Sequence, residues 1–413
     1  MTSRPMRSPG RKRLLASRLY NPFTLKCTSK PKLPYSLDPF GVLFKELNPM
    51  EEFMVKEFVN PSNFTQLMVM PRIGKDMHRE AVQVFLQHYD DLHDGCFSMY
   101  GAFASAVQMS FPGYDDKANL QSATAALKKF CAMPCPETSN EFGKWIWLGL
   151  TVAIYAHCAL GSPASPVRRT ILAHVVAVGK KGREMRRHPL VESFITLDIL
   201  ECLIYRQSPI ANLEAERCAG LLSFPGLATP LVRFLYRLCL INARERESLD
   251  DEDAALDELE SEVEAWQPDL ATESLAGCTA IQASHVLTRT RAHKTAILLY
   301  IHRIRWSFGA EDSTANSLAA SILSDLDLTS ATTQQTPEWV SLPFLLAGIE
   351  AESLQKREKI ETDLQKYVDS ISPKARAMAT EFLRALWVAR DRTVVQFRWM
   401  DIVDFLPPLC VYI

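Results

Sequence analysis

The chain has 413 residues, of which 47% are hydrophobic and 23% charged, and its formal net charge at pH 7 is −2. This composition is ordinary for a soluble globular protein, and the length predicts two or three packed lobes or one large helical array. Because the net charge is close to zero, no field of the whole chain favours binding to nucleic acid or to a membrane.

The first segment, residues 1–34, is basic and rich in Ser and Pro. Nine Lys or Arg residues and no Asp or Glu precede Asp38, so we expect a disordered segment. Arg11, Lys12 and Arg13 fit a nuclear import signal. A solvated basic tail and a mitochondrial transit peptide are the other two interpretations, and no apolar core of a secretory signal follows the basic residues.

The second segment, residues 35–413, has apolar residues at helical spacing between stretches of Gly, Pro and polar residues. No strand-rich section occurs, so we predict one all-α domain, a large irregular helical array. The expected helices cover residues 49–58, 76–92, 99–110, 117–131, 142–160, 167–178, 190–205, 210–224, 231–241, 250–266, 272–306 (as one helix or two), 318–328, 352–371, 373–391 and 397–405.

One uncharged stretch, residues 145–167, calls for a comparison with a membrane span. Its apolar part ends at Gly161, which leaves fewer than the roughly 20 residues that a spanning helix requires. We therefore expect a buried helix and no membrane partner.

Ten cysteines are scattered through apolar segments, and no Cys-x-x-Cys pair occurs. Cys131 and Cys135 are the closest pair, with His157 and Cys158 downstream, but this spacing differs from that of the common zinc modules. Buried reduced thiols in a reducing compartment are the favoured interpretation. We expect no metal and no cofactor.

A second polar cluster invites a metal interpretation, because a His-x4-His pair with interleaved acids would share one face of a continuing helix. We instead expect Asp94-Gly95 to end the helix, which would make the cluster a polar C-terminal turn. The cluster consists of His88, Asp90, Asp91, His93 and Asp94.

Basic residues gather in two further places. Residues 180–187 contain five Lys or Arg, but no phosphate-binding motif, so a solvated loop is favoured over a phosphate site. Along residues 289–305, charged side chains surround an apolar stripe, which fits a core helix with a charged outer face better than a helix that reads a DNA groove. These side chains are Arg289, Arg291, Lys294, His302, Arg303 and Arg305.

The C-terminal third has two signals for the start of a helix. Thr336-Pro337-Glu338 and Ser372-Pro373 each combine a capping hydroxyl with a proline in the first turn. Pro343 should kink or restart the first of these helices, and Gly348 permits a close approach of a neighbouring element. We expect Glu352 and Lys356 to pair at i,i+4 on the following helix.

These residues belong to a longer pattern, which consists of Leu342-Pro343-Phe344, Ala347-Gly348-Ile349-Glu350-Ala351, Arg357, Trp387-Val388-Ala389-Arg390-Asp391 and Trp399. It resembles the regulatory region of fungal transcription factors of the zinc binuclear-cluster class, in the second of two broad types. The run from Ala296 to Arg303 is similar to that family's alanine-to-Leu-Tyr helix. The resemblance implies the all-helical fold of that regulatory domain.

The chain departs from that family in one respect, because the family carries six N-terminal cysteines that bind two zinc ions and read DNA. Cys27 is the sole cysteine among the first 95 residues. Two interpretations follow, a gene model without an upstream exon and a natural regulator that acts through a partner.

No nucleotide loop, GxSxG elbow, HExxH motif or kinase signature occurs, so we expect no catalytic residues. The resemblance implies a nuclear transcriptional regulator of a metabolic or secondary-metabolite gene set. It would act through protein partners, such as a DNA-binding regulator or a second copy, or through an unknown small-molecule effector, and would reach DNA only indirectly. The alternatives are a helical scaffold outside transcription and an enzyme with a dispersed active site.

Overall fold

The structure of the protein is a computed structural model, which describes residues 84, 87–106, 116–162, 165–178, 185, 188–211, 229–243, 249–268, 279–368, 372–393 and 396–409. Across these ranges the regular structure is helical and no strand occurs, which confirms the all-α prediction. The elements are α6 (Tyr89–Ala106), α7 (Asp116–Ala132), α8 (Ser139–Tyr155), the π-helix η2 (Ala156–Leu160), α9 (Ser165–Ala177), α11 (Pro189–Tyr205), α12 (Thr229–Ala243), α13 (Leu249–Ala265), α14 (Ala280–Arg305), α15 (Asp312–Thr333), α16 (Ser341–Ile349), α17 (Leu354–Tyr367), α18 (Pro373–Arg392), and the 3₁₀ turns η3 (Trp399–Asp401) and η4 (Val403–Phe405).

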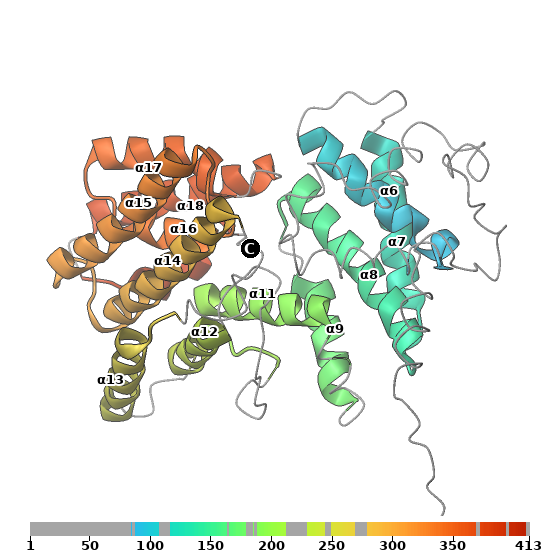
Figure 1. Cartoon of the computed structure of the whole chain (residues 1–413), viewed down its shortest axis with the longest axis horizontal. Coiled ribbons are helices and arrows are strands. Elements are labelled where there is room, and N and C mark those ends of the chain that lie inside the picture. Colours follow the sequence, from blue (N-terminus) through green and yellow to red (C-terminus); the bar gives the residue numbers. More distant parts are fainter. Residues whose placement is uncertain are drawn as a thin grey trace, which may run out of the picture.

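The helices form two groups that share one continuous hydrophobic core (Figure 1). In this view α6, α7 and α8 lie on the right and α14 to α18 on the left, while α11 runs between them. The two groups also touch directly, because η2 packs against α18 and the Ser372 hydroxyl donates a 2.9 Å hydrogen bond to the His157 carbonyl. The C-terminal group is therefore anchored on the N-terminal one.

Helix α6 does not end at Asp94-Gly95, so that prediction is wrong. The helix continues to Ala106, and Gly95 lies where α6 meets α8. A Cβ at Gly95 would come within 2.3 Å of the Thr151 hydroxyl oxygen. Glycine is required there for close packing of two helices, and its presence does not mark a helix end.

Helix α8 confirms the buried helix expected within residues 145–167. Trp145, Ile146 and Leu148 are 4% exposed or less and belong to the core. Among the described residues, no helix is long and apolar enough to cross a membrane.

Helix α14 is a single 26-residue helix, but its charged outer face was only partly predicted. Arg291 is exposed, whereas Lys294 and Arg305 are half-buried. The three side chains pair with polar groups of α15, the α13 C-terminus and α13, respectively. Arg289 and Arg303 are instead 2% and 1% exposed, and His302 is also buried, at 8% exposed. Periodicity placed these two arginines outside, because it cannot detect the partners that make a buried charge stable.

Two helices begin at other residues than expected. Helix α15 starts at Asp312, six residues before the predicted start. Thr336-Pro337-Glu338 lies in the connection to α16, which begins at Ser341, so the helix start predicted there is wrong. Pro343 therefore occupies the first turn of α16, where its missing N–H costs no helical hydrogen bond.

The signal at Ser372-Pro373 is confirmed. The Ser372 hydroxyl accepts the Ala375 amide, and Pro373 is the first residue of α18. The helix predicted for residues 397–405 is instead the pair of 3₁₀ turns η3 and η4.

Several predictions fall outside the described residues. These are the basic segment 1–34 with its cluster at 11–13, the helix at 49–58, most of the helix at 76–92, the basic loop at 180–184 and 186–187, most of the helix at 210–224, and the last three residues of the helix at 352–371.

The close approach at Gly95 gives a test of the α6–α8 packing. We expect Gly95→Ala to lower the free energy of unfolding by about 1–3 kcal/mol, because the new methyl group overlaps the Thr151 side chain. Gly143→Ala in α8 is the matched control, since its Cβ would meet only Val84, at 3.7 Å. In this control the free energy of unfolding should rise by up to about 1 kcal/mol, because Ala has a higher helix propensity than Gly. Equal effects of the two variants in urea denaturation would contradict the packing.

Candidate functional site

A buried ion pair between Arg303 of α14 and Glu350 at the end of α16 forms the centre of the C-terminal group. The Arg303 Nε and Nη2 atoms donate to the two carboxylate oxygens of Glu350 at 2.9 and 2.6 Å. Both side chains are 2% exposed. This bidentate geometry is the strongest form that an arginine–carboxylate pair takes, and it fixes α14 against α16.

The remaining donors of Arg303 organise the turn between α14 and α15. Its Nη1 atom donates to the carbonyl oxygens of Trp306, Ser307 and Ala310 at 3.4, 3.2 and 3.5 Å. Its Nη2 atom also reaches Asp312 at 2.8 Å. Burial lowers the pKa of Arg303, but the hydrogen bonds and charges of Glu350 and Asp312 outweigh it and hold that pKa above its usual range.

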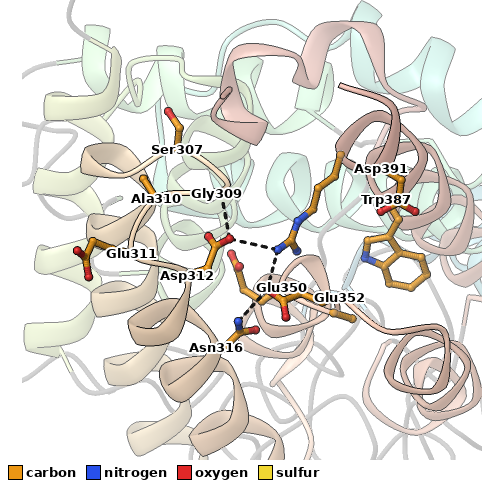
Figure 2. Close-up of polar contacts among 12 residues, drawn as sticks. Ser307, Gly309, Ala310, Glu311, Asp312, Asn316, Glu350, Glu352, Trp387 and Asp391 are labelled. Carbon is orange, nitrogen blue, oxygen red and sulfur yellow. Dashed lines mark hydrogen bonds and ion pairs between the residues drawn. The ribbon is translucent and has the colours of Figure 1, made fainter. Parts of the chain in front are cut away.

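Asp312 and Glu352 carry the network on towards the surface. The second oxygen of Asp312 accepts the Gly309 amide at 3.0 Å, and Glu352 accepts the Asn316 side chain at 2.9 Å (Figure 2). Arg390 of α18 donates to Glu352 at 3.1 Å and lies 3.8 Å from Asp312. The network therefore joins α14, α15, α16 and α18.

The predicted pair of Glu352 with Lys356 on one helix is wrong. Helix α17 begins at Leu354, so Glu352 precedes it and is free to bind Asn316 and Arg390 instead. The Ser353 hydroxyl caps this helix by accepting the Lys356 amide at 3.3 Å.

An aromatic ring lies beside both guanidinium groups. The centroid of Phe308 is 4.8 Å from the Arg303 guanidinium carbon and 4.6 Å from that of Arg390. A cation near an aromatic face gains electrostatic energy that does not need a hydrogen bond. Phe308 is buried and also packs edge-on against Phe397, so it ties the network to the hydrophobic core.

A second ion pair joins α17 to α18 at the edge of the network. Arg357 donates to both oxygens of Asp391 at 2.5 and 2.7 Å, and its Nε atom donates to the Ala351 carbonyl at 3.0 Å. The hydrogen bonds from Arg357 lower the pKa of Asp391, and those to Asp391 raise the pKa of Arg357.

Trp387 links this second pair to α16. Its indole N–H donates to the Gly348 carbonyl at 3.1 Å, and the Arg357 guanidinium lies 5.4 Å from its ring. A Cβ at Gly348 would lie 3.1 Å from Ile360, so the expected close approach at this glycine is confirmed. Gly348, Arg357 and Trp387 of the C-terminal sequence pattern thus converge on one place, although they belong to three helices.

Trp399 holds the last turns against the core. Its ring packs edge-on against Tyr300 at 5.7 Å, and the Tyr300 hydroxyl donates to the Leu203 carbonyl at 2.6 Å. The Asn242 side chain donates to the same carbonyl and to the Tyr300 hydroxyl. Helices α11, α12 and α14 therefore meet beneath η3.

The two metal interpretations do not lead to a site. In the ranges that the structure describes, no group of three or more His, Cys, Asp or Glu residues could hold a metal ion. Cys131 and Cys135 are exposed, so the expectation of buried thiols fails for them, whereas His157 and Cys158 are buried in η2. The expectation of buried thiols holds for Cys96, Cys158, Cys202 and Cys239.

The network is suited to holding helices in register. Its carboxylates at 312, 350, 352 and 391 are all bound by guanidinium groups, so none is arranged as a free acid or base. Sequence reasoning found Glu350, Arg357 and Trp387 through the pattern, but it missed Asp312 and the burial of Arg303. The sequence signal available for Asp312 was an acid three residues after Gly309, in the polar stretch that precedes the predicted helix.

The family model of the fungal-specific transcription factor domain matches residues 167–411, more than half of the chain. This span begins in α9 and contains the whole network, whereas α6, α7 and α8 precede it. No curated protein and no solved structure matches the chain.

The buried pair predicts unequal effects of two similar substitutions. We expect Glu350→Gln to lower the free energy of unfolding by about 3–5 kcal/mol, because it leaves the Arg303 charge buried without its main partner. Glu361→Gln should cost about 1 kcal/mol or less, because its partner Arg384 is exposed.

The double variant Arg303→Met/Glu350→Leu is the control for the charge itself. It should recover part of the stability lost in Glu350→Gln, since both buried charges are removed together. Urea unfolding followed by circular dichroism measures all three variants. Similar losses of unfolding free energy for Glu350→Gln and Glu361→Gln would show that the buried pair stabilises the fold no more than the exposed pair does.

Proposed function

Because the chain belongs to the fungal-specific transcription factor domain family, we propose that it is a nuclear regulator of transcription. The observation that carries this proposal is the family match over residues 167–411, which contains the complete network around Arg303 and Glu350. Its target genes in this proposal are a metabolic or secondary-metabolite set, as the resemblance implies.

We further propose that the domain acts by binding and that a partner supplies the contact with DNA. The guanidinium groups of Arg303, Arg305, Arg357 and Arg384 face carboxylates of the same chain, which leaves them poorly placed to bind phosphates. The partner is a DNA-binding regulator or a second copy of the chain. An effector would act by changing the contacts among α14 to α18.

A tethering experiment tests the regulatory role directly. The full chain is fused to a heterologous DNA-binding domain and brought to a reporter gene that carries the matching DNA site. We expect reporter expression to differ, upward or downward, from that with the DNA-binding domain alone. Glu350→Gln should remove the difference, because it weakens the core of the matched domain.

Glu361→Gln is the matched control for tethering, because it also removes one carboxylate but on an exposed pair, and it should keep the effect. If the folded wild-type fusion leaves expression unchanged, the regulatory role is wrong. A helical scaffold outside transcription then becomes the better explanation.

The nuclear location is tested through the basic cluster. We expect the tagged full chain to accumulate in the nucleus and to lose this location when Arg11, Lys12 and Arg13 are replaced by Ala. Replacement of Lys26, Lys30 and Lys32 by Ala removes the same charge from the same segment and should have no effect. Mitochondrial signal, or equal loss in both variants, would contradict an import signal at residues 11–13.

A further inference from the structure

Helix α13 has an extreme charge for its length. Its 17 residues contain nine Asp or Glu and no Lys or Arg. Acids stand four residues apart along it, as in Asp253 and Asp257 or in Glu260 and Glu264, and like charges at that spacing destabilise an isolated helix. The helical form of this segment therefore depends on contacts with the rest of the chain.

The contacts of α13 with the core are narrow. Leu256, Leu259 and Val263 are 1% exposed or less, and they form one stripe that packs towards α12 and α14. At the end of the helix, Trp266 packs edge-on against Phe234 of α12 at 6.3 Å. The other side chains described on α13 are exposed or half-buried.

Three cations surround this stripe. Arg237 of α12 binds Glu262 at 2.5 Å and approaches Glu258 at 3.5 Å. Arg305 of α14 pairs with Asp257 at 2.6 Å and with Glu260. These contacts place one cation on each flank of α13.

Lys294, also on α14, is the third cation. It donates to the carbonyl oxygens of Glu264 and Trp266 at 2.9 and 2.7 Å, where the negative end of the helix dipole favours a positive charge. We call Arg237, Lys294 and Arg305, together with the apolar floor between α12 and α14, the α13 seat.

The carboxylates in the ion pairs of the seat lie at or near the surface, whereas their partners Arg237 and Arg305 are 26% and 18% exposed. Asp257, Glu258 and Glu262 have side chains that are 76%, 70% and 45% exposed. Such pairs are weak and are screened by salt. All nine residues of α16, by contrast, are buried, so α13 and α16 are held by different forces.

We propose that α13 is a displaceable helix and that the α13 seat is a docking site for an acidic amphipathic helix of a partner protein. The seat fits a helix with apolar residues at i, i+3 and i+7 and with acids on both flanks, because α13 itself has that pattern. Nucleic acid would satisfy the three cations but would leave the apolar floor uncovered. The proposed replacement of α13 by a partner helix rests on these contacts alone and does not depend on a role in transcription.

Hydrogen exchange of the unmodified full chain tests whether α13 is displaceable. Raising NaCl from about 0.05 M to about 1 M shortens the Debye length to roughly 3 Å. We expect exchange in α13 to accelerate by about tenfold or more, while α16 stays protected and serves as the internal control. Equal protection of α13 at both salt concentrations would overturn the proposal.

Binding in trans tests the seat itself. A fluorescent peptide of residues 249–268 is added to the full-length variant Asp257→Asn/Glu260→Gln, which weakens the hold of its own α13 and leaves Arg305 in place. Fluorescence anisotropy should show binding about tenfold tighter than to the wild type, because the seat is more often open. Adding Arg305→Glu to this variant should abolish the gain in peptide affinity.

Two controls separate a fitted helix from unspecific charge. A peptide with Leu256→Ser and Leu259→Ser keeps every acid and should not bind, and a short DNA duplex should not bind better to the weakened variant than to the wild type. Equal binding of the serine peptide, preferential binding of the duplex, or no binding of the wild-type peptide would each overturn the proposal.

Discussion

The ion pair between Arg303 and Glu350 is the constraint on which the C-terminal group depends. Removing an arginine and a carboxylate from water costs several kcal/mol for each charge, and their attraction repays that cost only if the remaining donors find acceptors. Arg303 finds three carbonyls and Asp312 in the turn between α14 and α15. The turn must therefore adopt one shape, and α15 must begin at Asp312.

The network becomes more exposed from Arg303 outward, and the contribution of its ion pairs to stability falls in the same direction. The Arg303 side chain is 2% exposed, that of Arg390 is 12% exposed, and that of Glu352 is 45% exposed. Inner pairs stabilise a unique arrangement of helices, while outer pairs add little energy and are screened. Trp387 lies between the inner and the outer pairs. Its indole N–H donates to the Gly348 carbonyl of α16, and its ring packs against the Arg357 guanidinium.

Local sequence signals predicted much of the fold but little of the network. The cap at Ser372 and the helix at residues 250–266 were predicted because both depend on neighbours within one or two turns. The burial of Arg303 depends on Glu350, 47 residues away, so no periodicity could indicate it. A helix restart near Pro343 was expected, but the first residue of that helix, Ser341, was not. The path of the chain between α15 and α16 depends on tertiary contacts, which local patterns do not indicate.

Helix α14 carries an arginine of the buried pair and an arginine of the α13 seat only two residues apart. Arg303 points into the core and Arg305 points to α13, although they stand almost side by side in sequence. Their side chains leave the helix in different directions, since two residues correspond to about 200° of rotation. A change of occupant at Arg305 can thus leave the bonds of Arg303 intact. The same helix combines a fixed interior with an edge whose contacts respond to salt and to acidic partners.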